Sequence, residues 1–308
     1  MTTLLLSHAD CLGHEPGRMH PESPARLRAV MAALGDPRFA ALERREAPLA
    51  SRAAIALVHP EPYIDMVLGA VPESGAVALD PDTVLSPGSG EAALRASGAA
   101  IAAVDAVASG QAKNAFCAVR PPGHHAEPQR AMGFCMFNGV VVGAMHARAQ
   151  YGAQRVAVVD FDVHHGNGTQ RVAERDADLF YGSTHQYPFY PGTGAASETG
   201  LGNVANAPLP AGTDGRLLRR AFAERIMTEL EEFAPDFLFV SAGFDSHIDD
   251  PLGGMRLDES DFTALTETLV EFAERRCGGR LVSILEGGYD LAALGRSAAA
   301  HVAVLMAA

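Results

Sequence analysis

Six short apolar runs recur along the chain and predict the strands of a sheet. They lie at 3–8, 114–120, 155–161, 178–184, 236–243 and 280–288. Apolar and polar positions do not alternate within them, as they would in a strand with one face in water. The runs therefore predict strands that are buried on both faces, which is typical of a parallel sheet.

Longer segments with helical periodicity separate these runs, at 89–110, 137–152, 214–233 and 257–276. The last segment offers Asp258 as an N-cap, with Asp261 as its partner in the first turn. Strands that alternate with helices predict an α/β fold with a mainly parallel central sheet flanked by helices. No repeat, low-complexity tract or charged linker divides the 308 residues, so we expect a single domain over 1–308.

Polar residues with catalytic or metal-binding side chains follow five of the predicted strands, at the point where each strand ends. In chain order they are His124 and His125, Asp162 and His164, Ser183, Asp245, and Tyr289. The carboxyl ends of parallel strands meet at one edge of a sheet, and ligands of open α/β sheets bind there. We therefore expect one active site at this edge.

The stretch VAVVDFDVHHGNGTQ, residues 156–170, places Asp160, Asp162 and His164 at every second position. Side chains two positions apart in an extended chain point to the same face. Burying unpaired carboxylates is costly, so a cation is expected among them. Asp162, His164 and Asp245 would give three ligands with one position open, which is the arrangement of catalytic zinc sites. Such ligands accept iron(II) as well as zinc.

The stretch RPPGHHAE places His124 and His125 side by side after a Pro-Pro-Gly turn, which fixes the backbone direction. Asp160 can hydrogen-bond to His124, and Asn167 can hydrogen-bond to His125. Such partners select the tautomer of an imidazole, so the pattern favours an acid–base pair. Tyr289 follows two glycines in EGGYDL and could donate a hydrogen bond to a carbonyl oxygen that gains negative charge.

Composition narrows the class of protein. Hydrophobic residues make up 48% of the chain and charged residues 20%, which is typical of a globular enzyme. The net charge of −13 argues against non-specific binding to nucleic acid or anionic membranes. Four cysteines occur without a CxxC pair, which favours a reducing compartment. No apolar run has the length of a membrane span or of a signal peptide core, so we expect a cytoplasmic protein.

Several of these stretches together resemble the zinc-dependent histone deacetylase family, and within it the class II and bacterial histone deacetylase-like amidohydrolase branch. In family order the matching stretches are HPESPARL, RPPGHHAE, GFCMFN, VVDFDVHHGNGT, YPGTG, SAGFDSHIDDPLGG and LEGGYDL. They extend over residues 20–290, nearly the whole chain. The resemblance implies the arginase-like α/β fold and the hydrolysis of acetyl-lysine side chains in proteins or peptides.

The resemblance also implies a role for individual residues. Zinc would be bound by Asp162, His164 and Asp245. The catalytic residues would be His124 and His125 as the acid–base pair and Tyr289 as the carbonyl polariser. A structural potassium ion would be bound by Asp160, Asp162, His164, Ser183 and Thr184. The substrate would contact Gly133, Phe134, Tyr190, Leu252 and Gly287.

Two positions depart from the family's common pattern. Asn167 stands where class I members carry aspartate, and its neutral side chain is expected to make His125 a weaker base than theirs. Tyr190 stands where a phenylalanine of the acyl-lysine tunnel is common. Tyr289, by contrast, is the residue of efficient deacetylases, whereas class IIa enzymes carry histidine there.

Other functions remain open for the same motifs. An acetylpolyamine amidohydrolase catalyses the same type of reaction on small acetylated amines. Polyamine-selective members of the family carry glutamate where this chain has Leu252, which favours acetyl-lysine. A catalytically silent acyl-lysine-binding module would lack a metal ligand or the polariser, and all of them are present. An arginase-like dimanganese hydrolase would need more acidic ligands. The sequence is also compatible with a homo-oligomer.

Overall fold

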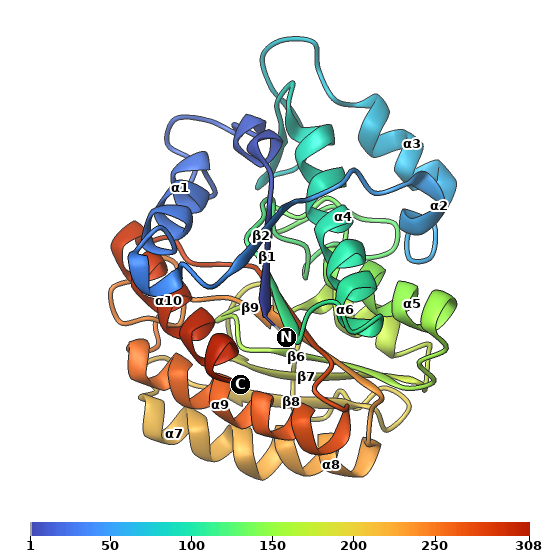
Figure 1. The fold of residues 1–308 in the computed structure, drawn as a ribbon. Helices are drawn as coiled ribbons and strands as arrows, with labels where there is room; N and C mark the ends of the chain where they lie inside the picture. Colours follow the sequence, from blue (N-terminus) through green and yellow to red (C-terminus); the bar gives the residue numbers. More distant parts are fainter. Residues whose placement is uncertain (1) are drawn as a thin grey trace.

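The computed structural model describes residues 2–308 and contains one eight-stranded sheet (Figure 1). The strand order is β2-β1-β5-β10-β9-β6-β7-β8. The strands are β1 (Thr3–Ser7), β2 (Glu43–Glu46), β5 (Asn114–Cys117), β6 (Val156–Asp160), β7 (Leu179–Gln186), β8 (Val204–Leu209), β9 (Phe237–Ala242) and β10 (Leu281–Leu285). Every neighbouring pair is parallel, so all eight carboxyl ends lie at one edge.

Helices cover both faces of the sheet (Figure 1). One layer contains α1 (Pro24–Ala33), α7 (Gly215–Ala221), α8 (Thr228–Phe233), α9 (Glu259–Arg276) and α10 (Leu291–Ala307), and a turn of π-helix (Phe222–Met227) joins α7 to α8. The other layer contains α4 (Ser89–Ala108), α5 (Gly139–Tyr151) and α6 (Asn167–Ala173). Beside it lie α2 (Arg52–Ile55), α3 (Glu61–Gly69) and the antiparallel hairpin of β3 (Val77–Asp80) and β4 (Thr83–Leu85).

The two helical layers explain why the strands lack alternation. Every residue of β5, β6, β7, β9 and β10 is buried, because each strand has helices on both sides. The predicted fold class, an α/β fold with a mainly parallel central sheet, is confirmed. All six apolar runs contain strands and all four periodic segments contain helices. Helix α9 begins as predicted, with a capping box between Asp258 and Asp261.

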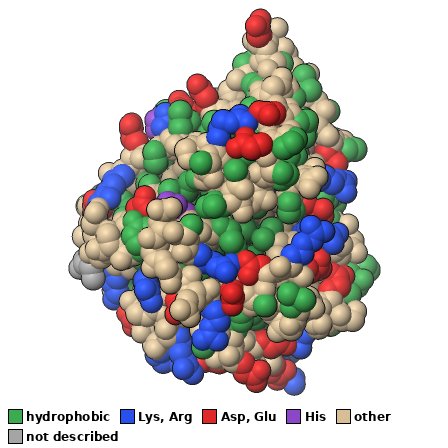
Figure 2. All heavy atoms as spheres, turned by 90° about the vertical axis from the view of Figure 1, so that its right-hand side faces the viewer, with side chains coloured by type: hydrophobic (Ala, Val, Ile, Leu, Met, Phe, Trp, Pro, Cys, Tyr) green, Lys and Arg blue, Asp and Glu red, His purple; other side chains and the backbone are tan. Residues whose placement is uncertain are grey.

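The surface is mixed in character. On the face drawn in Figure 2, acidic, basic and apolar side chains are interspersed, so the net negative charge is not concentrated there. Among residues 2–308, no helix has both the length and the apolar character needed to cross a membrane.

Candidate active site

A cavity of about 460 Å³ opens at the carboxyl edge of the sheet. Its lining residues are Asp82, His125, Gly133, Phe134, His164, Gln186, Phe189, Tyr190, Pro251, Leu252, Gly253, Gly254 and Tyr289. They come from the ends of several strands and from the tip of the β3–β4 hairpin. The cavity is therefore where the sequence analysis expects the active site.

Three potential metal ligands meet at this cavity. Asp162 and His164 follow β6, and Asp245 follows β9; one ligand atom from each lies within 4.8 Å of the others. His164 Nδ1 is 3.1 Å from a carboxylate oxygen of Asp162 and 3.1 Å from one of Asp245. Glycines leave room behind the carboxylates, because a Cβ atom at Gly243 or at Gly287 would lie 2.1 Å from a carboxylate oxygen of Asp162 or Asp245, respectively.

The electrostatics of this group favour a cation. Burial opposes a charge on His164, but the two carboxylates outweigh it and raise the pKa of His164 to about 10. Burial and the charge of Asp162 raise the pKa of Asp245 to about 7, because two carboxylates share one low-dielectric site. For Asp162, His124 and His164 outweigh burial and lower the pKa below its usual range. The side chains alone thus concentrate negative charge at one buried point.

This donor set fits zinc. Two carboxylates and one imidazole are hard or borderline ligands that zinc accepts, and the cavity leaves the fourth position accessible to substrate or water. The set therefore has the composition of a catalytic rather than a closed structural site.

The tandem histidines lie beside the ligands, and each has a different partner. His124 Nδ1 is 2.9 Å from the Asp160 carboxylate, and His125 Nδ1 is 2.9 Å from Asn167 Oδ1. The amide of Asn167 is oriented by its Nδ2, which donates to Glu127 at 2.9 Å. Asn167 Oδ1 must therefore accept, so His125 carries its proton on Nδ1 and Nε2 is free to act as a base.

The surroundings of the two rings also shift their pKa values in opposite directions. Burial opposes a charge on His124, but Asp160, Asp162 and Glu286 outweigh it and raise the pKa of His124 to about 10. Burial lowers the pKa of His125 well below its usual value, and the neighbouring His124 and His164 lower it further. One imidazole is therefore charged and its neighbour neutral near pH 7.

Tyr289 lies in the loop after β10 and is ready to donate a hydrogen bond. Burial raises the pKa of its phenol well above the usual value, so the hydroxyl keeps its proton. The guanidinium of Arg26 stacks over the Tyr289 ring at 4.8 Å from the ring centre. The loop is also fixed from the other side, because Asp250 accepts the N–H of Tyr289 at 2.6 Å.

Aromatic side chains form the cavity walls. Phe134 packs edge-on to Tyr289 at 5.8 Å, and Tyr190 packs edge-on to His125 at 5.2 Å. Gly133 has φ +58°, and a Cβ atom there would lie 2.3 Å from the His125 ring, so only glycine permits this approach. Leu252 also lines the cavity.

Gly287, which the resemblance implies as a substrate contact, lies behind the ligand carboxylates. It is not among the lining residues of the cavity, and its N–H donates to Asp162 at 2.8 Å. The physical reason is its position behind the carboxylates, where the backbone takes the place of a side chain. Gly287 therefore contacts a potential metal ligand.

Three of the residues predicted to bind potassium, Asp160, Ser183 and Thr184, lie together on the neighbouring strands β6 and β7. Asp160 ends β6 and pairs in register with Ser183 of β7, next to Thr184. The hydroxyl of Thr184 is buried without a hydrogen-bond partner among residues 2–308, and Ser183 Oγ lies 2.9 Å from His185 Nδ1. The Asp160 carboxylate accepts from His124, Tyr181 and the Asp162 N–H.

Sequence reasoning missed several residues that shape the site. Asp82 reaches the cavity from the hairpin, and Phe189 stacks on the His164 ring at 5.3 Å. Glu286 lies buried beneath the tandem histidines, and Arg26 reaches Tyr289 from α1. The glutamate of LEGGYDL and the arginine of HPESPARL lie inside recognised motifs, and this was the one signal that could have identified them.

Comparisons with known proteins agree with this arrangement. The sequence pattern of the "Histone deacetylase domain" matches residues 20–305. A "Histone deacetylase-like amidohydrolase" of Pseudomonas aeruginosa is 41% identical and covers 88% of this chain and 72% of its own length. "Histone deacetylase 14, chloroplastic" of Arabidopsis thaliana is 37% identical and covers 96% of this chain and 75% of its own. The crystal structure of the HDA15 HD domain superposes with a TM-score of 0.95 at 34% identity, over 100% of this chain and 89% of that one.

Proposed function

The chain belongs to the histone deacetylase family, and we propose that it is a zinc-dependent deacetylase that removes acetyl groups from lysine side chains of proteins or peptides. One observation carries the proposal: His164 of the Asp162–His164–Asp245 ligand set lines the same cavity as the imidazole of His125. Metal-assisted hydrolysis needs a metal and a base side by side, and the described residues supply a place for both.

Zinc bound to this set would polarise the amide carbonyl and lower the pKa of a water molecule towards about 7. His125 Nε2 would take the proton from that water and later return it to the leaving amine, because Asn167 keeps the ring in the required tautomer. Tyr289 would donate a hydrogen bond to the carbonyl oxygen as it gains negative charge. The charged His124 would support the same negative charge from a distance.

The proposed substrate follows from the cavity walls. Phe134, Phe189, Tyr190 and Leu252 suit the aliphatic part of an acetyl-lysine side chain, which is uncharged once acetylated. A polyamine keeps a second ammonium group, which would have to be met at the mouth. Leu252 cannot attract that group. Asp82 is the one acidic side chain of the lining, and it already accepts the Gly133 N–H at 2.9 Å.

A structural potassium ion is part of the proposal. The buried carboxylates of Asp160, Asp162, Asp245 and Glu286 have no Lys or Arg contact within residues 2–308. One zinc ion and the imidazolium of His124 would leave one negative charge in this group, which a monovalent cation beside Asp160 would offset. The predicted cytoplasmic location stays a prediction.

The proposal is tested by metal analysis together with turnover. The purified protein should contain about one zinc ion per chain by mass spectrometry. It should release acetate from an acetyl-lysine peptide with a higher kcat/KM than from acetylated putrescine or spermidine. A preference for either polyamine would support the acetylpolyamine alternative, and a stoichiometric metal without turnover of any amide would contradict the proposal.

A further inference from the structure

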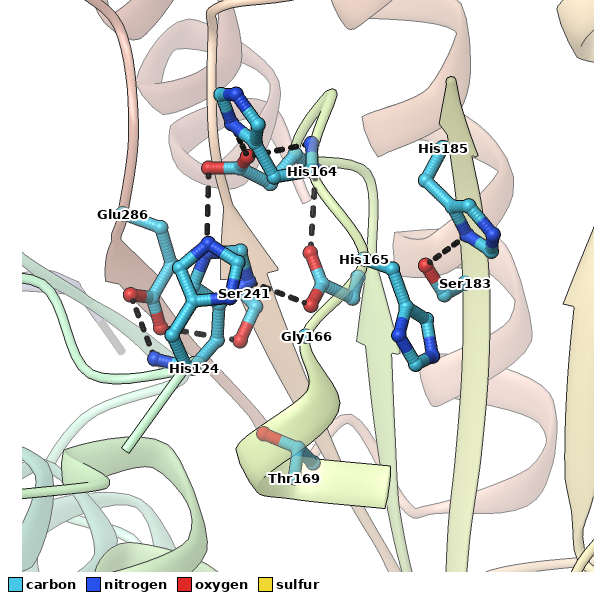
Figure 3. Close-up of polar contacts among 12 residues, drawn as sticks. His124, His164, His165, Gly166, Thr169, Ser183, His185, Ser241 and Glu286 are labelled. Carbon is cyan, nitrogen blue, oxygen red and sulfur yellow. Dashed lines mark hydrogen bonds and ion pairs between the residues drawn. The ribbon is translucent and has the colours of Figure 1, made fainter. Parts of the chain in front are cut away.

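The Glu286 carboxylate binds the backbone of the tandem-histidine turn from below. Glu286 follows β10 and is wholly buried. Its Oε2 accepts the N–H of Gly123 at 2.7 Å and the N–H of His124 at 3.2 Å, and its Oε1 accepts the hydroxyl of Ser241 at 3.1 Å. Figure 3 shows the dashed lines from the Glu286 carboxylate to His124 and to Ser241, which come from different strand ends. One side chain thus joins the ends of three neighbouring strands.

The turn needs such an acceptor. Its two N–H groups point into the interior, where an unsatisfied buried donor costs about 1–3 kcal/mol. The other side of the turn has no room for movement, because a Cβ atom at Gly123 would lie 2.8 Å from Gly139 N and 2.9 Å from Phe137 O. The turn is therefore held between the start of α5 and the Glu286 carboxylate.

No Lys or Arg side chain among residues 2–308 forms an ion pair with the Glu286 carboxylate. Arg26 donates to the backbone carbonyl of Glu286, not to its carboxylate. Burial raises the pKa of Glu286 to about 7, although His124 and the Gly123 N–H lower it. The arrangement of acceptors, rather than a salt bridge, is thus what Glu286 contributes to the turn.

We propose that Glu286 is a positioning residue for the amide hydrolysis: its two accepted hydrogen bonds fix the main chain at His124 and so place the His125 ring over the reacting groups. This inference rests on the proposed function. Glu286 acts through the position of its carboxylate oxygen and not through the charge of the carboxylate. Glutamine can meet the same geometry, because its carbonyl oxygen accepts both N–H groups while its amide donates to Ser241.

Two substitutions separate position from charge. Glu286→Gln keeps the position and removes the charge, so kcat should stay within about threefold of the parent. Glu286→Asp keeps the charge but withdraws the oxygens by one methylene. We expect kcat to fall by about 10- to 100-fold with KM within twofold, because small misplacements of catalytic groups reduce the rate by this order.

Glu198 provides a matched control. Its carboxylate also accepts two backbone N–H groups, those of Gly194 and Ala195 at 3.0 Å each, but it does not contact the tandem histidines. Glu198→Asp should leave kcat unchanged. Zinc content and the melting midpoint are measured for every variant, so that loss of metal or of fold is recognised.

The outcomes are distinct. The inference is supported if kcat decreases in the order parent, Glu286→Gln, Glu286→Asp, and if all three proteins retain zinc. A Gln variant slower than the Asp variant, equal rates in all three, or loss of zinc from the Asp variant would overturn it. A parent protein that hydrolyses no acetylated amine would instead overturn the proposed function itself.

Discussion

Two buried groups of charged side chains lie a short distance apart, and they are balanced differently. At the cavity, the basic side chains that contact Asp160, Asp162 and Asp245 within residues 2–308 are the imidazoles of His124 and His164, and the nearby Glu286 has no Lys or Arg partner there. On the other side of Tyr289, the single carboxylate of Glu22 meets three basic side chains. They are Arg120 at 2.6 Å, His14 at 3.2 Å and Arg26 at 3.3 Å.

This difference in charge distinguishes a group with a structural role from a group that binds an ion. The Glu22 group contains two guanidinium groups for its one carboxylate, so it needs no added cation. It ties α1 to the β5 turn and, through Arg26, to the loop of Tyr289. The acidic group contains more negative than positive charge, and a buried excess of charge is unstable unless it binds a cation. We therefore assign metal binding and catalysis to the acidic group at the cavity and not to the Glu22 group.

The largest effect is expected from removing a ligand of the acidic group. Asp245→Ala should lose the bound zinc and all measurable deacetylation, because two side chains do not hold the ion at this site. The fold should persist, since Asp245 belongs to a loop after β9. Mass spectrometry of the metal content, with circular dichroism for the fold, measures both. Full zinc occupancy in the variant would remove Asp245 from the ligand set.

The next effect separates the two histidines of the same group. His125→Ala should lower kcat by about 10² to 10⁴, the usual contribution of a general base. His124→Ala should leave measurable turnover, because its charged ring supports the reaction from a distance. Steady-state kinetics of both variants at pH 8 gives the order. If the His124 variant is the less active one, the two roles should be exchanged.

A substitution in the Glu22 group should lower the free energy of unfolding rather than the metal content. Arg120→Met removes the nearest partner of a buried ion pair, which donates to both oxygens of Glu22 at 2.7 and 2.6 Å, and breaking such a pair costs about 3–5 kcal/mol. Urea denaturation of the zinc-loaded protein measures the free energy of unfolding. The zinc content should remain that of the parent. Loss of zinc without loss of stability would mean that the two groups are not independent.

Tyr289 lies between the two groups, and in the proposed mechanism its hydroxyl acts together with the acidic one. Tyr289→Phe removes a hydrogen bond that strengthens in the transition state, so kcat should fall by about 10² to 10³. Zinc content and stability should change little, since the ring still packs against Arg26. A change confined to KM would show that Tyr289 only binds substrate.

The smallest effect concerns pH. Burial would raise the pKa of Glu22, but Arg120 and His14 outweigh it and hold the pKa well below its usual range. A lowered folded-state pKa stabilises the protein above the unfolded pKa of about 4.3, and this contribution is lost as pH falls further. Between pH 5 and 3 the parent should therefore lose stability more steeply than Glu22→Gln. Parallel slopes in chemical denaturation would contradict the assignment.

The sequence predicted the acidic group at the cavity far better than the Glu22 group. Asp162 and His164 follow a recognisable buried strand, and strand ends converge in any parallel sheet. Glu22 and Arg120 are 98 positions apart, and no periodicity links them. The same limit applies to Glu286, whose partner Gly123 lies 163 positions away. Pairings of this kind depend on the packed fold and not on local pattern.

The strands that escaped prediction have a local cause. Strand β2 has the sequence ERRE and lies at the edge of the sheet, where charged side chains are tolerated because one side faces water. Strand β8 at the opposite edge contains Ala, Asn and Pro, which are weak strand formers. Apolar runs therefore revealed the centre of the sheet and not its two edges.

The glycines behind the ligand carboxylates divide the cavity into a fixed part and a variable part. Any side chain at Gly243 or Gly287 would displace Asp162 or Asp245, so neither position can drift during evolution without loss of the site. Tyr190 and Leu252 lie at the walls and have no comparable constraint. Natural or laboratory-selected descendants of this protein should therefore keep both glycines. They should come to accept different amides through substitutions at wall positions such as Tyr190 and Leu252.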